Sequence, residues 1–167
     1  MRRLLDALLI CALQLSFPHG GICESSDAPK GFLGIEWGED IESAKAKMLK
    51  RQGVVFDTAI TDQGHQRLLF QLGTFLDEPV DTWNLEFLKG KFFWVKIIID
   101  SENFAEIESV LVMKYGTPDV SATGMEEWRF PEATVRFIAN SPQGHTSVIF
   151  QNNKLCLYLK MIFQNLV

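Results

Sequence analysis

The chain has 167 residues, with 16 basic and 21 acidic side chains, a formal net charge of −5 and only three cysteines. A surface of this sign repels phosphate backbones, so the composition excludes a typical nucleic-acid-binding protein and no nucleic-acid partner is expected. The length is sufficient for one domain with a substantial hydrophobic core.

Residues 1–23 have the pattern of an export signal. Arg2 and Arg3 precede a mostly apolar run over residues 4–17, and Pro18 and Gly20 interrupt that run. The run is shorter than the roughly 20 residues that a membrane-spanning helix needs. We therefore predict a signal peptide over 1–23, a flexible leader over 24–30, no integral membrane span in the mature chain, and a periplasmic or secreted location in a Gram-negative bacterium.

Cys23 leaves a second interpretation open, in which it becomes the lipid-bearing first residue of an outer-membrane lipoprotein. The preceding Gly20, Gly21 and Ile22 do not match the usual lipidation signal, so soluble export is favoured over lipid attachment at Cys23 and over an uncleaved anchor. Removal of the signal would leave Cys156 as the only cysteine, which predicts that no disulfide framework supports the fold.

The domain opens with residues 31–38, and the first predicted helix follows them. Asp40 is a good N-cap, residues 41–49 carry an apolar stripe at helical spacing, and Gly53 is a stop signal. A second helix is predicted from Ser101 to Tyr115, with Asn103 and Glu106 as a capping pair. Its apolar stripe consists of Phe104, Ile107, Leu111 and Tyr115.

Strand signals follow each helix. Alternation of apolar and polar residues from Asp81 onward predicts a half-buried strand, Lys89-Gly90 a hairpin turn, and 91–99 a central strand that is apolar on both faces. Further turns are expected at 61–64, 77–79, 141–144 and 152–153. The other predicted strands are 54–60, 67–75, 126–130, 134–139, 146–151 and 155–163.

This order predicts an α+β fold made of two helix-plus-antiparallel-meander halves in one compact unit. Each half consists of one helix and about four strands. The expected domain covers 31–167, with halves at 31–100 and 101–167.

The sequence does not identify a catalytic site. His65 and His145 lie at predicted turns and neither is at i, i+4 to another metal ligand, and no serine has a nucleophile motif. Glu126 and Glu127 are adjacent in a predicted strand and should point to opposite faces, so they do not form a catalytic pair. We expect no enzymatic activity, no cofactor and no metal site.

Aromatic residues are the remaining candidates for a binding site, although most of them should be in the core. Trp37 and Trp128 are the candidates for contact with a ligand or partner, and Trp128 is the one expected nearest the surface because Glu127 and Arg129 flank it.

Several segments resemble a family of uncharacterised bacterial exported proteins. The segment from Phe32 to Gly38 matches an F-x-G-I-x-W-G opening, Tyr115 to Pro118 matches a Y-G-x-P helix exit, and a strand follows the Lys-Gly turn. The helix-and-sheet repeat is also similar in outline to the β-lactamase-inhibitor protein and to small outer-membrane assembly lipoproteins. These resemblances imply an exported α+β protein and no particular activity.

The sequence thus favours an exported, non-enzymatic interaction module of the bacterial envelope, with an envelope protein or peptide as partner. The alternative is a binder of a small hydrophobic ligand, with a cleft between a helix and the sheet. A hydrolase with a site assembled only in the fold is a third hypothesis.

Overall fold

The structure is a computed structural model, and it describes residues 28–62, 65–99, 104–139 and 145–157. The predicted signal peptide, Cys23 and most of the predicted leader lie outside these residues, as does the predicted turn at 141–144. Pro29 and Lys30, at the end of the predicted leader, are hydrogen-bonded through their carbonyl oxygens to Trp37.

The described chain contains the helices α1 (Ile41–Leu49) and α2 (Phe104–Tyr115), a further helical segment at 153–157 and a series of antiparallel strands, which supports the predicted α+β class. The strands are β1 (Gly31–Phe32), β2 (Ile35–Glu36), β3 (Val55–Asp62), β4 (His65–Gln71), β5 (Thr74–Phe75), β6 (Glu78–Leu88), β7 (Lys91–Ile99), β8 (Val120–Ala122), β9 (Met125–Arg129), β10 (Ala133–Ile138) and β11 (Thr146–Asn152).

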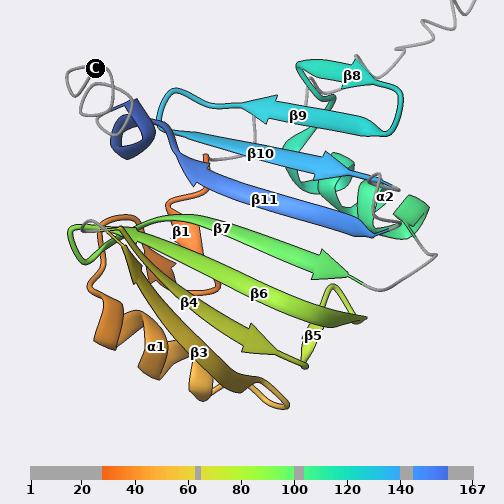
Figure 1. The fold of residues 1–167 in the computed structure, drawn as a ribbon. Helices are drawn as coiled ribbons and strands as arrows, with labels where there is room; N and C mark the ends of the chain where they lie inside the picture. Colours follow the sequence, from red (N-terminus) through yellow and green to blue (C-terminus); the bar gives the residue numbers. More distant parts are fainter. Residues whose placement is uncertain (1–27, 63–64, 100–103, 140–144, 158–167) are drawn as a thin grey trace, which may run out of the picture.

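One nine-stranded sheet organises the molecule. Its strands follow the order β3-β4-β6-β7-β11-β10-β9-β8, with β5 paired to β6 outside this path, while β1 and β2 form a separate hairpin. β7 is therefore central, as its apolar sequence predicts. Figure 1 shows α1, α2 and β1 behind the sheet.

The core lies between the sheet and these helices. Alternate residues of β6, namely Trp83, Leu85 and Phe87, are completely buried and join one hydrophobic cluster. Both helices contribute buried residues to the same cluster, Ala44 and Met48 from α1 and Ile107, Leu111 and Tyr115 from α2. Because alternate residues of a strand point to opposite faces, both helices cover the same face of the sheet.

Local sequence signals explain the helix and hairpin boundaries. The Asp40 side chain accepts a 2.9 Å hydrogen bond from the Ser43 backbone N–H, which confirms Asp40 as the N-cap of α1. Leu49, which the predicted stripe included, is exposed. Lys89 and Gly90 both have positive φ and join β6 to β7, which confirms the predicted tight turn.

The predicted strand at 67–75 is wrong in its second half. Leu72 and Gly73 have φ values of 63° and 83°, which extended backbone does not allow, so β4 ends at Gln71 and β5 starts at Thr74. The next turn is at Leu76-Asp77, and Pro79 is already part of β6.

The predicted strand at 155–163 is also wrong where the structure describes it, because residues 153–157 are helical. The Asn152 side chain accepts a 2.9 Å hydrogen bond from the Leu155 N–H and caps this turn, so Asn152-Asn153 does not form a hairpin. The Asn153 side chain bonds the Thr134 hydroxyl and the Phe130 carbonyl, which fixes the turn against β10. Residues 158–163 lie outside the described part.

Within the described residues, neither helix is both long enough and apolar enough to cross a lipid bilayer.

Candidate ligand-binding cleft

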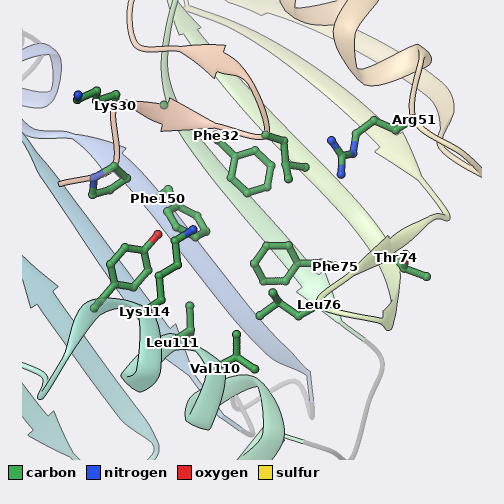
Figure 2. Close-up of a pocket in the computed structure, with 14 residues that line it drawn as sticks. Lys30, Phe32, Arg51, Thr74, Phe75, Leu76, Val110, Leu111, Lys114 and Phe150 are labelled. Atoms are coloured by element: carbon green, nitrogen blue, oxygen red, sulfur yellow. The ribbon is translucent and has the colours of Figure 1, made fainter. Parts of the chain in front are cut away.

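A cavity of about 460 Å³ opens between α2, the β1 strand, the β5 hairpin and the face of β11 (Figure 2). Its volume is in the range of sites that hold small organic molecules. These elements are far apart in the sequence, so only the fold assembles the cavity.

One side of the cavity is formed by α2. Val110, Leu111, Lys114 and Tyr115 line it. Lys114 is four residues after Val110, and Tyr115 is four residues after Leu111. The four side chains therefore share one edge of the helix. Leu111 and Tyr115 are buried, whereas Val110 is half-buried and Lys114 is exposed, so this edge runs from the core to the surface.

The β1–β2 hairpin forms the opposite side through Gly31, Phe32 and Leu33. A Cβ atom at Gly31 would lie 2.0 Å from the Ile35 carbonyl oxygen, so the close approach of the two strands requires glycine here. The turn uses Leu33 and Gly34, both with positive φ. This hairpin directs Phe32 inward, where only 4% of the residue is exposed.

Aromatic rings form the floor. The ring of Phe32 lies 5.1 Å from that of Phe150 and 6.1 Å from that of Phe75, measured between centroids. Phe75 and Phe150 meet edge to face at 6.3 Å. The floor is therefore apolar and is held in place by contacts among β1, β5 and β11.

The β5 hairpin closes the remaining side. Leu76 and Asp77 both have positive φ, 53° and 66°, a conformation that turns the chain tightly but is unfavourable for leucine. Leu76 is 36% exposed and lines the cavity. Backbone strain of this kind is retained only where the surrounding structure imposes it, and it is concentrated at functional sites.

The rim of the cavity is basic. Lys30, Arg51 and Lys114 are in the lining, and no described carboxylate is part of it. In Figure 2 the Arg51 guanidinium and the Lys114 amino group extend toward the aromatic floor, whereas Lys30 points away from it. The Lys114 nitrogen lies 5.2 Å from the centre of the Tyr115 ring, within the range of a cation–π contact.

A second cavity of about 520 Å³ adjoins the first. The two share Leu33, Arg51 and Thr74 in their linings. The second cavity is more polar and adds Lys47 and Lys50. Lys47 already forms an ion pair with Glu39 at 2.8 Å, so Lys50 and Arg51 are its cations without such a pairing among the described ion pairs.

Tyr115 contributes a weakly acidic hydroxyl group to the lining of the first cavity. Burial raises the pKa of Tyr115 to about 12, so its hydroxyl remains protonated at neutral pH. The cleft therefore offers neutral apolar surface and positive charge.

The two tryptophans proposed from the sequence are not in this lining. Trp37 is half-buried, stacks on Phe92 with centroids 5.1 Å apart, and donates a 2.7 Å hydrogen bond to the Pro29 carbonyl. Its contacts join the N-terminal segment to β7.

Trp128 was expected near the surface, and this expectation is wrong. Only 1% of it is exposed, and its indole N–H donates a 2.8 Å hydrogen bond to the Gly116 carbonyl at the end of α2. The charged neighbours Glu127 and Arg129 point to the other face of the sheet, so they do not indicate the environment of Trp128. Trp128 is a core residue that anchors α2.

The other candidate catalytic groups are also separated from the cleft. His65 forms a 2.9 Å contact with Glu86, and Glu86 also pairs with Arg67 at 3.0 Å on the sheet face opposite the core. Among the described residues there is no group of three or more histidine, cysteine, aspartate or glutamate side chains placed to hold a metal ion.

Sequence reasoning missed the residues that form the cleft. Phe32, Phe75 and Phe150 are ordinary core phenylalanines in the sequence, and nothing in their spacing shows that they meet. The sequence carried one signal for the cleft, on the second predicted helix. There Val110 and Leu111 lie one turn before Lys114 and Tyr115, so these residues share one edge of the helix.

Comparisons with known proteins add no relative: no protein-family model, curated protein or solved structure matches the chain.

Proposed function

We propose that this chain is a non-enzymatic binding module of the bacterial envelope, and that the cleft between α2 and the sheet binds a small apolar ligand. The observation that carries this proposal is the cavity of about 460 Å³ with a floor of Phe32, Phe75 and Phe150. Each CH₂ group that a ligand buries on such a floor contributes about 0.8 kcal/mol. Export to the periplasm, by the predicted signal over 1–23, would place the module there.

Decan-1-ol is a suitable probe because it is neutral and long enough to cover the aromatic floor. We expect saturable binding by isothermal titration calorimetry, with a negative heat-capacity change from burial of apolar surface. Val110→Asp places a hydrated carboxylate in the lining and should weaken binding by about tenfold, since that group loses water when the alcohol covers it.

The matched control is Val112→Asp. Val112 is on the same helix but is exposed and outside the lining, so this variant should bind decan-1-ol like the wild type. If the wild type does not bind the alcohol, or if both variants lose binding equally, the cleft is not the ligand site.

An envelope protein as partner is a second candidate. Val112 and Met113 are consecutive residues of α2 that are 37% and 74% exposed, so they offer apolar surface to a partner. Cross-linking in the native host followed by mass spectrometry should capture one discrete envelope protein, and Met113→Lys should abolish that capture. A cross-linking pattern unchanged by Met113→Lys would contradict this assignment.

We also propose how the secondary-structure elements are grouped within the domain. Residues 31–167 would form two helix-plus-meander halves, 31–100 and 101–167, that share one sheet. The strand order supports this, because β3, β4, β6 and β7 occupy one side of the sheet and β11, β10, β9 and β8 the other.

A further inference from the structure

We infer that the ligand of the cleft is a single-chain amphiphile with an acidic headgroup, of the fatty-acid class. This inference rests on the proposed apolar-ligand function and specifies the chemistry of the ligand. Its starting point is that the apolar cavity and the basic cavity meet at Leu33, Arg51 and Thr74.

The two cavities have complementary requirements. The first provides an aromatic floor that excludes water from an alkyl chain, and its lining contains Phe32, Phe75 and Phe150. The second is polar and carries Lys50 and Arg51 next to Thr74. A molecule that occupies both must have an apolar part and a polar part at its end.

The charge of the rim determines the sign of the headgroup. The whole chain has a formal net charge of −5, yet the described residues that line these two cavities are basic where they are charged. In Figure 2 Arg51 and Lys114 extend from opposite sides toward the space above the floor. A guanidinium group binds a carboxylate through two parallel hydrogen bonds, so Arg51 fits an acidic head better than a neutral one.

The exposed position of the cations agrees with this arrangement. Arg51 and Lys114 are exposed, and the described ion pairs include neither of them. A bound head would remain near solvent while its chain extends toward Phe75 and Phe150, which is how an amphiphile avoids desolvation of its charge.

The test compares three ten-carbon probes on the full mature chain below their micelle concentrations: decanoate, decan-1-ol and decyltrimethylammonium. Decanoate should bind about tenfold more tightly than decan-1-ol, the cation should bind more weakly than the alcohol, and the advantage of decanoate should shrink as salt is added. Inorganic phosphate alone should not bind measurably.

Arg51→Ala and Lys114→Ala should each lower the affinity for decanoate more than the affinity for decan-1-ol, and so remove most of the advantage of decanoate. Lys91→Ala, which removes one positive charge from an exposed lysine outside both cavities, should leave all three affinities within about twofold.

The outcomes separate this inference from the proposed function. Equal affinities for decanoate and decan-1-ol would overturn the acidic head and leave the apolar cleft standing. Failure of every probe to bind would overturn the proposed function itself. Phosphate binding as tight as that of decanoate would show a plain anion site and contradict the amphiphile.

Discussion

Phe32 and Phe150 meet with their ring centroids 5.1 Å apart, although Phe32 is on the short β1 strand and Phe150 is near the end of β11. This contact joins the N-terminal hairpin to the centre of the sheet. It also forms the floor of the cleft, because both residues are buried and both line the cavity.

Truncation of Phe32 should therefore affect stability as well as the cleft. Phe32→Ala removes a buried ring that contacts Phe75, Trp83 and Phe150, and we expect the free energy of unfolding to fall by about 3–5 kcal/mol. Urea denaturation followed by tryptophan fluorescence measures this change. Met113→Ala, at an exposed position, should change stability by less than about 0.5 kcal/mol, and similar losses in both variants would contradict the assigned packing.

The β1–β2 hairpin gives a second prediction from two glycines. Gly31→Ala should destabilise the protein by more than about 2 kcal/mol, because its Cβ would overlap the Ile35 carbonyl oxygen. Gly34→Ala adds a Cβ in open space and should cost only about 1 kcal/mol, the penalty of a left-handed backbone at φ +83°. Chemical denaturation of the two variants should preserve this order, and the reverse order would disprove the close approach of β1 and β2.

Substitution of Leu72 and of Leu76, both at positive φ, should have similar effects on stability but different effects on ligand binding. Leu72→Asn and Leu76→Asn each replace a leucine at positive φ with a residue that tolerates this conformation, so each should raise stability by about 0.5–1 kcal/mol. Leu76 lines the cleft and Leu72 does not, so only Leu76→Asn should weaken binding of decan-1-ol. Thermal melts and calorimetry measure the two effects, and weaker binding in Leu72→Asn would argue against the assigned lining.

Glu126 and Glu127 are neighbours in β9 with opposite electrostatic environments. Burial raises the pKa of Glu126, and the charge of Glu108 on α2 and a hydrogen bond with it raise that pKa further. For Glu127, burial is the largest influence and acts to raise the pKa, but hydrogen bonds from Arg129 and Arg136 and their charges outweigh it, so its pKa is below the ordinary value. The Arg129 contact measures 2.6 Å.

These directions predict opposite pH responses. The folded state binds the Glu126 proton more tightly than the unfolded state does, so this group lowers stability as pH rises through and above its ordinary pKa. Glu126→Gln should therefore increase stability at about pH 7 and change it little at about pH 4. Urea midpoints at the two pH values measure the difference, and an equal gain at both would contradict the raised pKa.

The folded state binds the Glu127 proton more weakly, so this group stabilises the fold above its ordinary pKa, and the contribution is lost as pH falls through the folded value. Glu127→Gln should lower stability at about pH 7 and have a smaller effect at acid pH. It also leaves the half-buried Arg136 of β10 with a neutral partner, which adds to the loss.

Local signals in the sequence were sufficient for the elements that depend on them. Asp40 as N-cap, Lys89-Gly90 as a hairpin turn and Ile107, Leu111 and Tyr115 as the buried stripe of α2 all follow from short-range chemistry. The opposite orientation of Glu126 and Glu127 followed from strand geometry alone.

The errors arose where longer-range contacts decide the backbone. Asn152 and Asn153 are typical turn residues, but their side chains cap a helical turn and bond Phe130 and Thr134, which are about twenty residues away. Leu72 and Leu76 adopt positive φ, for which leucine gives no signal. A cleft between a helix and the sheet was one of the alternatives, but its residues were missed for the same reason, since its floor combines residues from three separate strands.

The position of a bound ligand tests the assignment of the cleft directly. Decanoate carrying a nitroxide near the end of its chain should broaden the amide NMR signals of Val110, Leu111 and Phe75, and reduction of the nitroxide should restore them. We expect this broadening to be centred on the cleft and to be lost in Val110→Asp. Broadening centred on the outer face of α1, or spread evenly over the sheet, would contradict it.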